Sequence, residues 1–209
     1  MEIVLIRHGE PQLASVMLHD PELTSLGVEQ ARLLGAYLVD EDVAAVYTSP
    51  LRRAAQTAET IGSVLGRTPV VRDDLAEFDR DAPEYLDFTK LAADGDPRYA
   101  AFTRGDLSPW GTDLEAFRRR IATEFDQIVG DHRGQRVAVV AHGGVANCYL
   151  GTILGADRLS IHKPAHTGFA RVMADSTGRR ELVSMNETSH LRPLRLSALA
   201  ARFCPFTAE

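Results

Sequence analysis

Two histidines in this sequence follow two short apolar runs, each at the point where a buried strand would end. Residues 3–6 lead into Arg7-His8-Gly9, and residues 136–141 lead into His142-Gly143-Gly144. Both runs are rich in β-branched residues and too short for helices, which favours buried parallel strands. Ligands of open α/β sheets bind at the carboxyl ends of such strands. If the two strands are neighbours, His8 and His142 face one another across a single pocket.

These residue types suit an anionic phosphoryl group. The planar guanidinium of arginine can donate two hydrogen bonds to one phosphate, and neutral histidine offers a ring nitrogen that can attack phosphorus. Arg7 supplies one guanidinium and the Arg52-Arg53 pair another, although spacing alone does not choose between these two. Gly143-Gly144 follow His142 where the predicted helix starts, and backbone N–H groups at a helix N-terminus favour an anion. The sequence therefore predicts a phosphate site.

Four motifs, taken in order, resemble the histidine phosphatase superfamily, the phosphoglycerate mutase-like proteins. They span nearly the whole chain: Leu5-Ile-Arg-His-Gly-Glu10, Thr48-Ser-Pro-Leu-Arg-Arg-Ala-Ala-Gln-Thr-Ala58, Leu75-Ala-Glu77 and Val140-Ala-His142-Gly-Gly144. Residues 186–191 are similar to the family's late strand-end segment. The resemblance implies phosphoryl transfer through a phosphohistidine, without a metal or another cofactor.

The resemblance also implies a role for each catalytic residue. His8 would be the nucleophile, and His142 would donate a hydrogen bond to the phosphoryl oxygens. Arg7 would bind the phosphate together with Arg53, because the family's functional arginine directly precedes an alanine. Glu77 would protonate the leaving group as a general acid and then act as a base.

The residues alone do not identify the acid, because several carboxylates lie near one another in the sequence. Nothing in the sequence itself separates Glu77 from Asp73, Asp74 or Asp79, any of which can be a solvated loop charge. The choice of Glu77 therefore depends on the family pattern.

Three further residues are candidate substrate contacts: Glu10, Ser15 and His166. His162 and His166 stand four residues apart, a spacing that would suit zinc on one face of a helix. Pro164 lies between them and argues against a regular helix. We therefore predict no metal site.

Two positions after the first motif favour a phosphatase over a mutase. Mutases of this family have hydrogen-bonding side chains where this chain has Pro11 and Ala14, and their following loop is longer. We expect a phosphomonoester phosphatase acting on a small phosphorylated metabolite. A cofactor-dependent phosphoglycerate mutase stays the first alternative, since Ser15 can replace part of the missing donors. A catalytically idle regulatory or binding module is the second.

Strand and helix patterns alternate along the chain, which predicts an α/β fold: a three-layer α/β/α sandwich with a mostly parallel sheet. Strands are expected near residues 2–6, 43–47, 70–71, 136–141, 169–174 and 181–185, and long helices near 27–39, 50–65, 112–130 and 144–155. The expected N-caps are Thr24, Ser49 and Thr112. One domain over residues 1–209 is expected, with short helices near 85–93 and 99–104 in a cap at about 79–111.

Composition restricts the partners. The net charge is −6 and no dense lysine or arginine run occurs, so we expect neither nucleic acid nor membrane as a partner. Nothing resembles a signal peptide, and Cys148 and Cys204 lack paired spacing, which favours a cytoplasmic location. The expected partner is a small phosphorylated substrate. The sequence does not identify that substrate, and it leaves open whether the chain is a homodimer.

Overall fold

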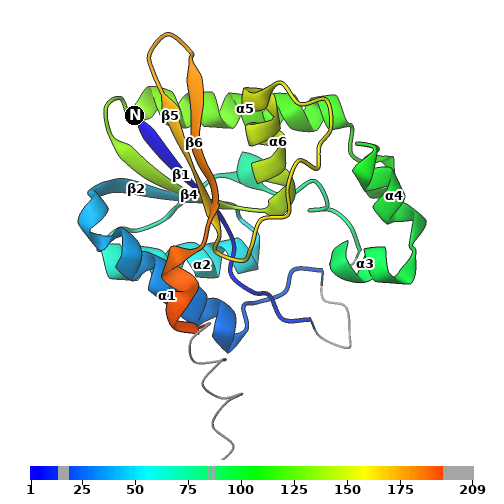
Figure 1. The fold of residues 1–209 in the computed structure, drawn as a ribbon, viewed down its shortest axis with the longest axis horizontal. Coiled ribbons are helices and arrows are strands. Elements are labelled where there is room, and N and C mark those ends of the chain that lie inside the picture. The colour runs from blue at the N-terminus through cyan, green and yellow to red at the C-terminus, as the bar shows by residue number, and fades with distance from the viewer. Residues whose placement is uncertain (14–18, 84, 86–87, 195–209) are drawn as a thin grey trace, which may run out of the picture.

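The computed structural model describes residues 1–13, 19–83, 85 and 88–194, and its strands form one six-stranded sheet (Figure 1). The order across the sheet is β3-β2-β4-β1-β5-β6. Strands β1, β2, β3 and β4 all run parallel to one another. Strand β5 runs antiparallel to both of its neighbours, β1 and β6. The strands are β1 (Glu2–Arg7), β2 (Val43–Thr48), β3 (Val70–Val71), β4 (Arg136–Ala141), β5 (Phe169–Ala174) and β6 (Arg180–Glu187).

Helices cover both faces of this sheet. They are α1 (Ser25–Leu38), α2 (Arg52–Leu65), α3 (Phe88–Asp94), α4 (Pro97–Thr103), α5 (Leu114–Asp131) and α6 (Gly143–Leu154). Short 3-10 turns occupy Val39–Glu41, Asp73–Leu75, Ser108–Trp110 and Ser189–Leu191.

Alternation along the central strand β1 explains the layers. Leu5 joins a core cluster that includes residues of α5 and α6, whereas Val4 and Ile6 join a second cluster with residues of α1 and α2. Successive strand residues point to opposite faces, so one strand contributes to two cores. The predicted three-layer α/β/α fold is confirmed.

One predicted helix cap is correct and two are wrong. Thr24 caps α1, since its Oγ1 accepts a hydrogen bond from the backbone N–H of Gly27 at 2.9 Å. The cap of α5 is Asp113 rather than Thr112, and its carboxylate accepts from the N–H of Ala116. Thr112 instead donates its hydroxyl to the carbonyl of Phe78.

The start of α2 is the second correction. The helix begins at Arg52, after the extended residue Leu51, so Ser49 and Pro50 precede it. The carboxylate of Asp20 accepts the N–H of Arg52 at 2.9 Å, and it comes from a loop 32 residues earlier. Ser49 is engaged elsewhere, because its Oγ lies 2.7 Å from Nε2 of His142. A cap supplied by a distant segment is invisible in the local sequence.

Helices α3 and α4 stand apart from the sheet, on the right of the view in Figure 1, whereas β2 lies on the left. They lie in the predicted cap region. Among the described residues, no helix is both long and apolar enough to cross a bilayer.

Candidate active site

The two histidines of the sequence motifs meet because β1 and β4 are parallel neighbours. Arg7 pairs with Ala141 in register, and the N–H of His8 donates to the carbonyl of Ala141. The ring centroids of His8 and His142 are 5.3 Å apart, and both side chains are buried. The predicted pairing of the two strand ends is therefore observed.

His8 is held in one tautomer. Its Nδ1 lies 2.7 Å from the carbonyl oxygen of Gly9, a group that can only accept, so Nδ1 carries the proton. Nε2 consequently bears the free lone pair. Burial, followed by the charges of Arg53 and Arg7, holds the pKa of His8 well below its usual range. The ring is neutral at pH 7, as a nucleophile requires.

Gly9 keeps this loop close to α1. A Cβ at Gly9 would lie 2.6 Å from the carbonyl oxygen of Gly27, so a side chain cannot fit without moving backbone. The N–H of Gly9 donates to Oγ1 of Thr57 on α2 at 2.9 Å. The loop that carries His8 is thus fixed from two helices.

The two adjacent arginines, Arg52 and Arg53, lie in different environments. The side chain of Arg53 is 2 % exposed, whereas that of Arg52 is 54 % exposed and pairs with Glu22 at the surface. Arg53 Nη1 lies 3.3 Å from Asp20, and its guanidinium stacks 4.8 Å from the ring centre of Tyr85. Nε of Arg53 is buried without a hydrogen-bond partner among the described residues.

Arg7 is anchored from the segment before β5. Its Nη1 donates to the carbonyl of Pro164 at 2.6 Å. That segment is held in turn by Thr167, whose N–H contacts the carbonyls of Arg7 and His8. Oδ1 of Asn186, in the late strand-end segment, accepts from the N–H of Ala165 at 2.8 Å.

Glu77 is buried, and the backbone of α6 holds its carboxyl group. Its Oε2 accepts from the N–H of Gly144 at 2.7 Å, and its Oε1 from the N–H of Phe78 at 3.1 Å. Burial and then the nearby charge of Asp79 raise the pKa of Glu77 to about 7. Such a carboxyl group can give and take a proton near neutral pH.

Of the other three candidate carboxylates, Asp79 shares this burial, whereas Asp73 and Asp74 do not. Asp79 is also buried, 3.9 Å from Arg53, and burial raises its pKa as well. Asp73 and Asp74 lie at the surface in a 3-10 turn. The structure thus narrows the candidate acids to Glu77 and Asp79, which line the same cavity.

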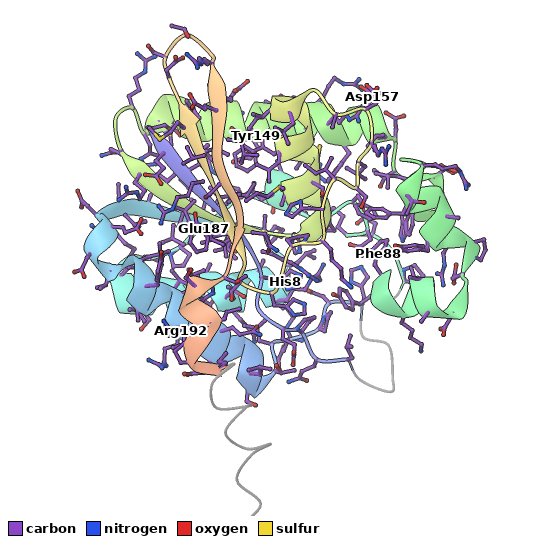
Figure 2. All side chains as sticks on the ribbon, viewed as in Figure 1. His8, Phe88, Tyr149, Asp157, Glu187 and Arg192 are labelled. Atoms are coloured by element: carbon purple, nitrogen blue, oxygen red, sulfur yellow. The ribbon has the colours of Figure 1, made fainter. Side chains whose placement is uncertain are left out.

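That cavity has a volume of about 220 Å³ and lies at the carboxyl edge of the sheet. Arg7, His8, Arg53, Glu77 and Gly143 line it together. Figure 2 shows His8 near the centre of the molecule, where strand ends and helices converge.

The remaining predicted residues are placed differently. Neither His142 nor His166 is among the described residues that line the cavity, and their ring centroids lie 5.3 Å and 5.8 Å from that of His8. Glu10 is not among the described residues that line the cavity, and its carboxylate accepts from Oγ1 of Thr24 at 3.1 Å. Ser15 lies outside the described residues.

Sequence reasoning missed several lining residues. His162 and Asn147 line the cavity, and Asn147 Oδ1 accepts from the N–H of His162 at 2.9 Å. Tyr85 was also missed, and it covers the guanidinium of Arg53. Their positions depend on long-range packing, and only His162 stood out in the sequence, through its spacing from His166.

The chain matches one known protein family over most of its length. The family model "Histidine phosphatase superfamily (branch 1)" matches residues 3–188. The chain is 33 % identical over 157 residues to phosphoglycerate mutase-like protein 4 of Arabidopsis thaliana, covering 69 % of this chain and 67 % of that protein. It is 28 % identical over 203 residues to putative phosphoserine phosphatase 2 of Hydrogenobacter thermophilus, covering 92 % and 98 %.

A solved structure is similar over nearly its full length. Phosphoserine phosphatase of Entamoeba histolytica, in complex with 3-phosphoglyceric acid, superposes with a TM-score of 0.75 at 24 % identity, covering 91 % of this chain and 98 % of that one. The chain spans about half the length (54 %) of the mycobacterial relatives that it matches at 31 % identity.

Proposed function

Because this chain belongs to the histidine phosphatase superfamily, we propose that it hydrolyses monoesters of small phosphorylated metabolites through a phosphohistidine intermediate. One observation carries the proposal. His8 is neutral and presents the lone pair of Nε2 in a cavity that also holds two guanidinium groups and a carboxyl group with a pKa of about 7. A nucleophile, a phosphate clamp and an acid are therefore side by side.

In the first step, the lone pair of His8 Nε2 forms a bond to phosphorus while the bond from phosphorus to the ester oxygen breaks. The departing oxygen takes the proton of the Glu77 carboxyl group, so the alcohol leaves neutral. In the second step, water attacks phosphorus and gives its proton to the Glu77 carboxylate. The bond from phosphorus to Nε2 breaks, and inorganic phosphate and the starting enzyme result.

The clamp stabilises the charge of the transferring phosphoryl group. Arg7 and Arg53 are aimed at the cavity from β1 and α2, and Gly143 begins α6 beside them. We assign the third donor to His142, because Ser49 occupies its Nε2 while its Nδ1 has no partner among the described residues. Donors fixed before the reaction stabilise the transition state without reorganisation.

The proposal includes one catalytic domain over residues 1–209 with a cap at about 79–111. Its support is that α3 and α4 contribute residues to the same cavity as the strand ends of the sheet. Hydrolysis rather than mutase activity is favoured by Pro11, which pairs with Leu23 in an isolated bridge and has no side-chain donor. Ala14, the second such position, lies outside the described residues.

The deciding experiment measures both reactions on the wild type and on His8→Ala. We expect release of inorganic phosphate from simple esters, little isomerisation of 3-phosphoglycerate with 2,3-bisphosphoglycerate, and an acid-labile, base-stable phosphate trapped on the wild type. The folded His8→Ala variant should lack both turnover and label. Faster isomerisation than hydrolysis would establish the mutase alternative, and a folded wild type without any turnover would establish the idle module.

A further inference from the structure

The two ends of the cavity differ in their residues. The end away from the phosphate clamp would contact the leaving group of the substrate. Arg7, Arg53 and His8 form the inner end. The outer end is bounded on the cap side by the aromatic residues Phe78, Tyr85, Phe88, Tyr99 and Phe102. Figure 2 shows Phe88 at α3, on the side toward His8.

This aromatic wall is an ordered cluster. The ring centroids of Phe88 and Phe102 are 4.5 Å apart, and Phe102 stacks on Phe78 at 5.7 Å with an interplanar angle of 23°. Phe78 is buried and directly follows the candidate acid Glu77. Tyr85 packs on the guanidinium of Arg53, which connects the wall to the phosphate end. A flat apolar group leaving from the phosphate would therefore lie against aromatic faces.

Charge disfavours an acidic leaving group on this side. Among the described lining residues, Phe78 of the wall stands between Glu77 and Asp79 in the chain, and both of these buried carboxyl groups are negative when ionised. Arg53, which contacts Tyr85 of the wall, lies 3.9 Å from the carboxylate of Asp79, which opposes its charge. Aromatic faces also carry negative partial charge. Apart from Arg7 and Arg53, Lys163 is the one lysine or arginine among the described lining residues, and it belongs to the segment before β5, not to the cap side.

Volume limits the size of the leaving group. The cavity of about 220 Å³ is smaller than the roughly 300–1,000 Å³ of pockets for drug-sized ligands. The phosphoryl group takes part of this space. The remainder suits a single ring better than a nucleoside or a disaccharide.

We propose that the substrate is the phosphate monoester of an apolar alcohol carrying one aromatic or similarly flat ring, rather than a phosphorylated amino acid or hydroxy acid. This inference rests on the proposed phosphatase function and specifies its substrate class. The wall holds the ring, while Glu77 stands next to the ester oxygen.

The test compares four alkyl phosphates. Alkyl alcohols are all poor leaving groups, so differences in rate report contacts with the enzyme rather than the reactivity of the ester. They are 2-phenylethyl phosphate, ethyl phosphate, O-phosphoserine and 3-phosphoglycerate. One methylene matched to an apolar pocket is worth about 10–200-fold in kcat/KM, so the phenylethyl ester should exceed each of the others by about tenfold or more. If either acid is hydrolysed as fast, this inference is wrong while the phosphatase function stands. If no ester releases phosphate, both are wrong.

A variant pair on α3 tests the charge argument without disturbing the core. Ala92 lines the cavity and Ala93 does not, yet both are exposed and adjacent on one helix. Ala92→Lys should raise the ratio of kcat/KM for 3-phosphoglycerate to that for 2-phenylethyl phosphate by about fivefold or more, in the range expected for a new nearby charge pair. Ala93→Lys is the matched control and should leave the ratio unchanged. Equal ratios in the two variants would overturn the assignment of this wall to the leaving group.

Phe102→Ala tests the ring contact itself. It should lower kcat/KM for 2-phenylethyl phosphate, by raising KM, at least about fivefold more than it lowers kcat/KM for ethyl phosphate, because the loss falls on ring contacts worth a factor of several each. A merely structural role of Phe102 would lower both esters equally, and that result would contradict the proposal.

Discussion

Replacement of Arg53 by methionine, with Arg52→Met as the matched control, separates two neighbouring residues of opposite environment. Arg53 is buried and lines the cavity beside His8, whereas Arg52 lies at the surface and pairs with Glu22. Methionine keeps much of the apolar volume of the side chain and removes the charge. The two variants differ in whether the lost guanidinium faces the phosphate. Arg53→Met also removes the partner of the buried Asp79, so the stability of each variant is measured beside its activity.

The magnitude follows from the number and kind of hydrogen bonds lost. A hydrogen bond to a charged group contributes about 1.5–3 kcal/mol, and each 1.4 kcal/mol is about tenfold in rate. Loss of one such bond from Arg53 to the phosphoryl group predicts a fall in kcat/KM of about 10–150-fold. The surface pair of Arg52 is worth about 0–1 kcal/mol to stability and nothing to the transition state, so its loss should change kcat/KM less than about twofold.

The assay is kcat/KM for ethyl phosphate as a function of pH, together with a thermal melt of each variant. Arg53 is one of the charges that hold the pKa of His8 down, after burial itself. Its removal should therefore also move the acidic limb of kcat/KM to higher pH, because His8 would take a proton more readily. An unchanged limb, or a larger loss in Arg52→Met than in Arg53→Met, would refute the assignment of the clamp.

Two further predictions follow. If Glu77 is the acid, kcat/KM for hydrolysis should fall above about pH 7, since burial and then the charge of Asp79 raise the pKa of Glu77 to about 7. Asp79→Asn should move that alkaline limb to lower pH, and a fixed limb would exclude the coupling. Gly144→Ala should sharply reduce kcat/KM, because its Cβ would lie 2.3 Å from Oε1 of Glu77. A Cβ at Gly130 meets nothing within 4 Å, so Gly130→Ala should leave kcat/KM unchanged and raise the free energy of unfolding by about 0.5–1 kcal/mol, the helix preference of alanine over glycine. Equal effects of the two glycine variants would show that Gly144 does not confine the carboxyl group.

The parts of the site that could be predicted are those that a strand end determines locally. His8 and His142 each follow an apolar strand by one residue, and parallel pairing of the two strands is enough to bring them together. The fold class followed from the same alternation of strands and helices. Arg53 was chosen over Arg52 only through family resemblance, because both stand in the first turn of α2 and local spacing gives them equal claims.

What could not be predicted depends on residues that meet from distant segments. Asp20, in a loop before α1, accepts the N–H of Arg52 at the start of α2, whereas Ser49 Oγ accepts the N–H of Leu51 and contacts the ring of His142. The predicted serine cap was wrong for this reason. The residue type allowed both roles, and only the tertiary fold decides which partner lies within reach.

The identity of the candidate acid also depends on tertiary packing. Four nearby carboxylates were chemically equivalent in the sequence, since an exposed aspartate or glutamate is ionised at pH 7 whatever its neighbours in the chain. Burial under the start of α6 separates them: Glu77 is enclosed and held by Gly144, whereas Asp73 and Asp74 stay in water. Exclusion of solvent, and then the charge of a second carboxylate, Asp79, together raise the pKa of Glu77 to about 7. The near-neutral pKa of Glu77 therefore depends on the packing of α6 against the Glu77 segment, and a variant that opens this packing should lower that pKa without altering a single titratable residue.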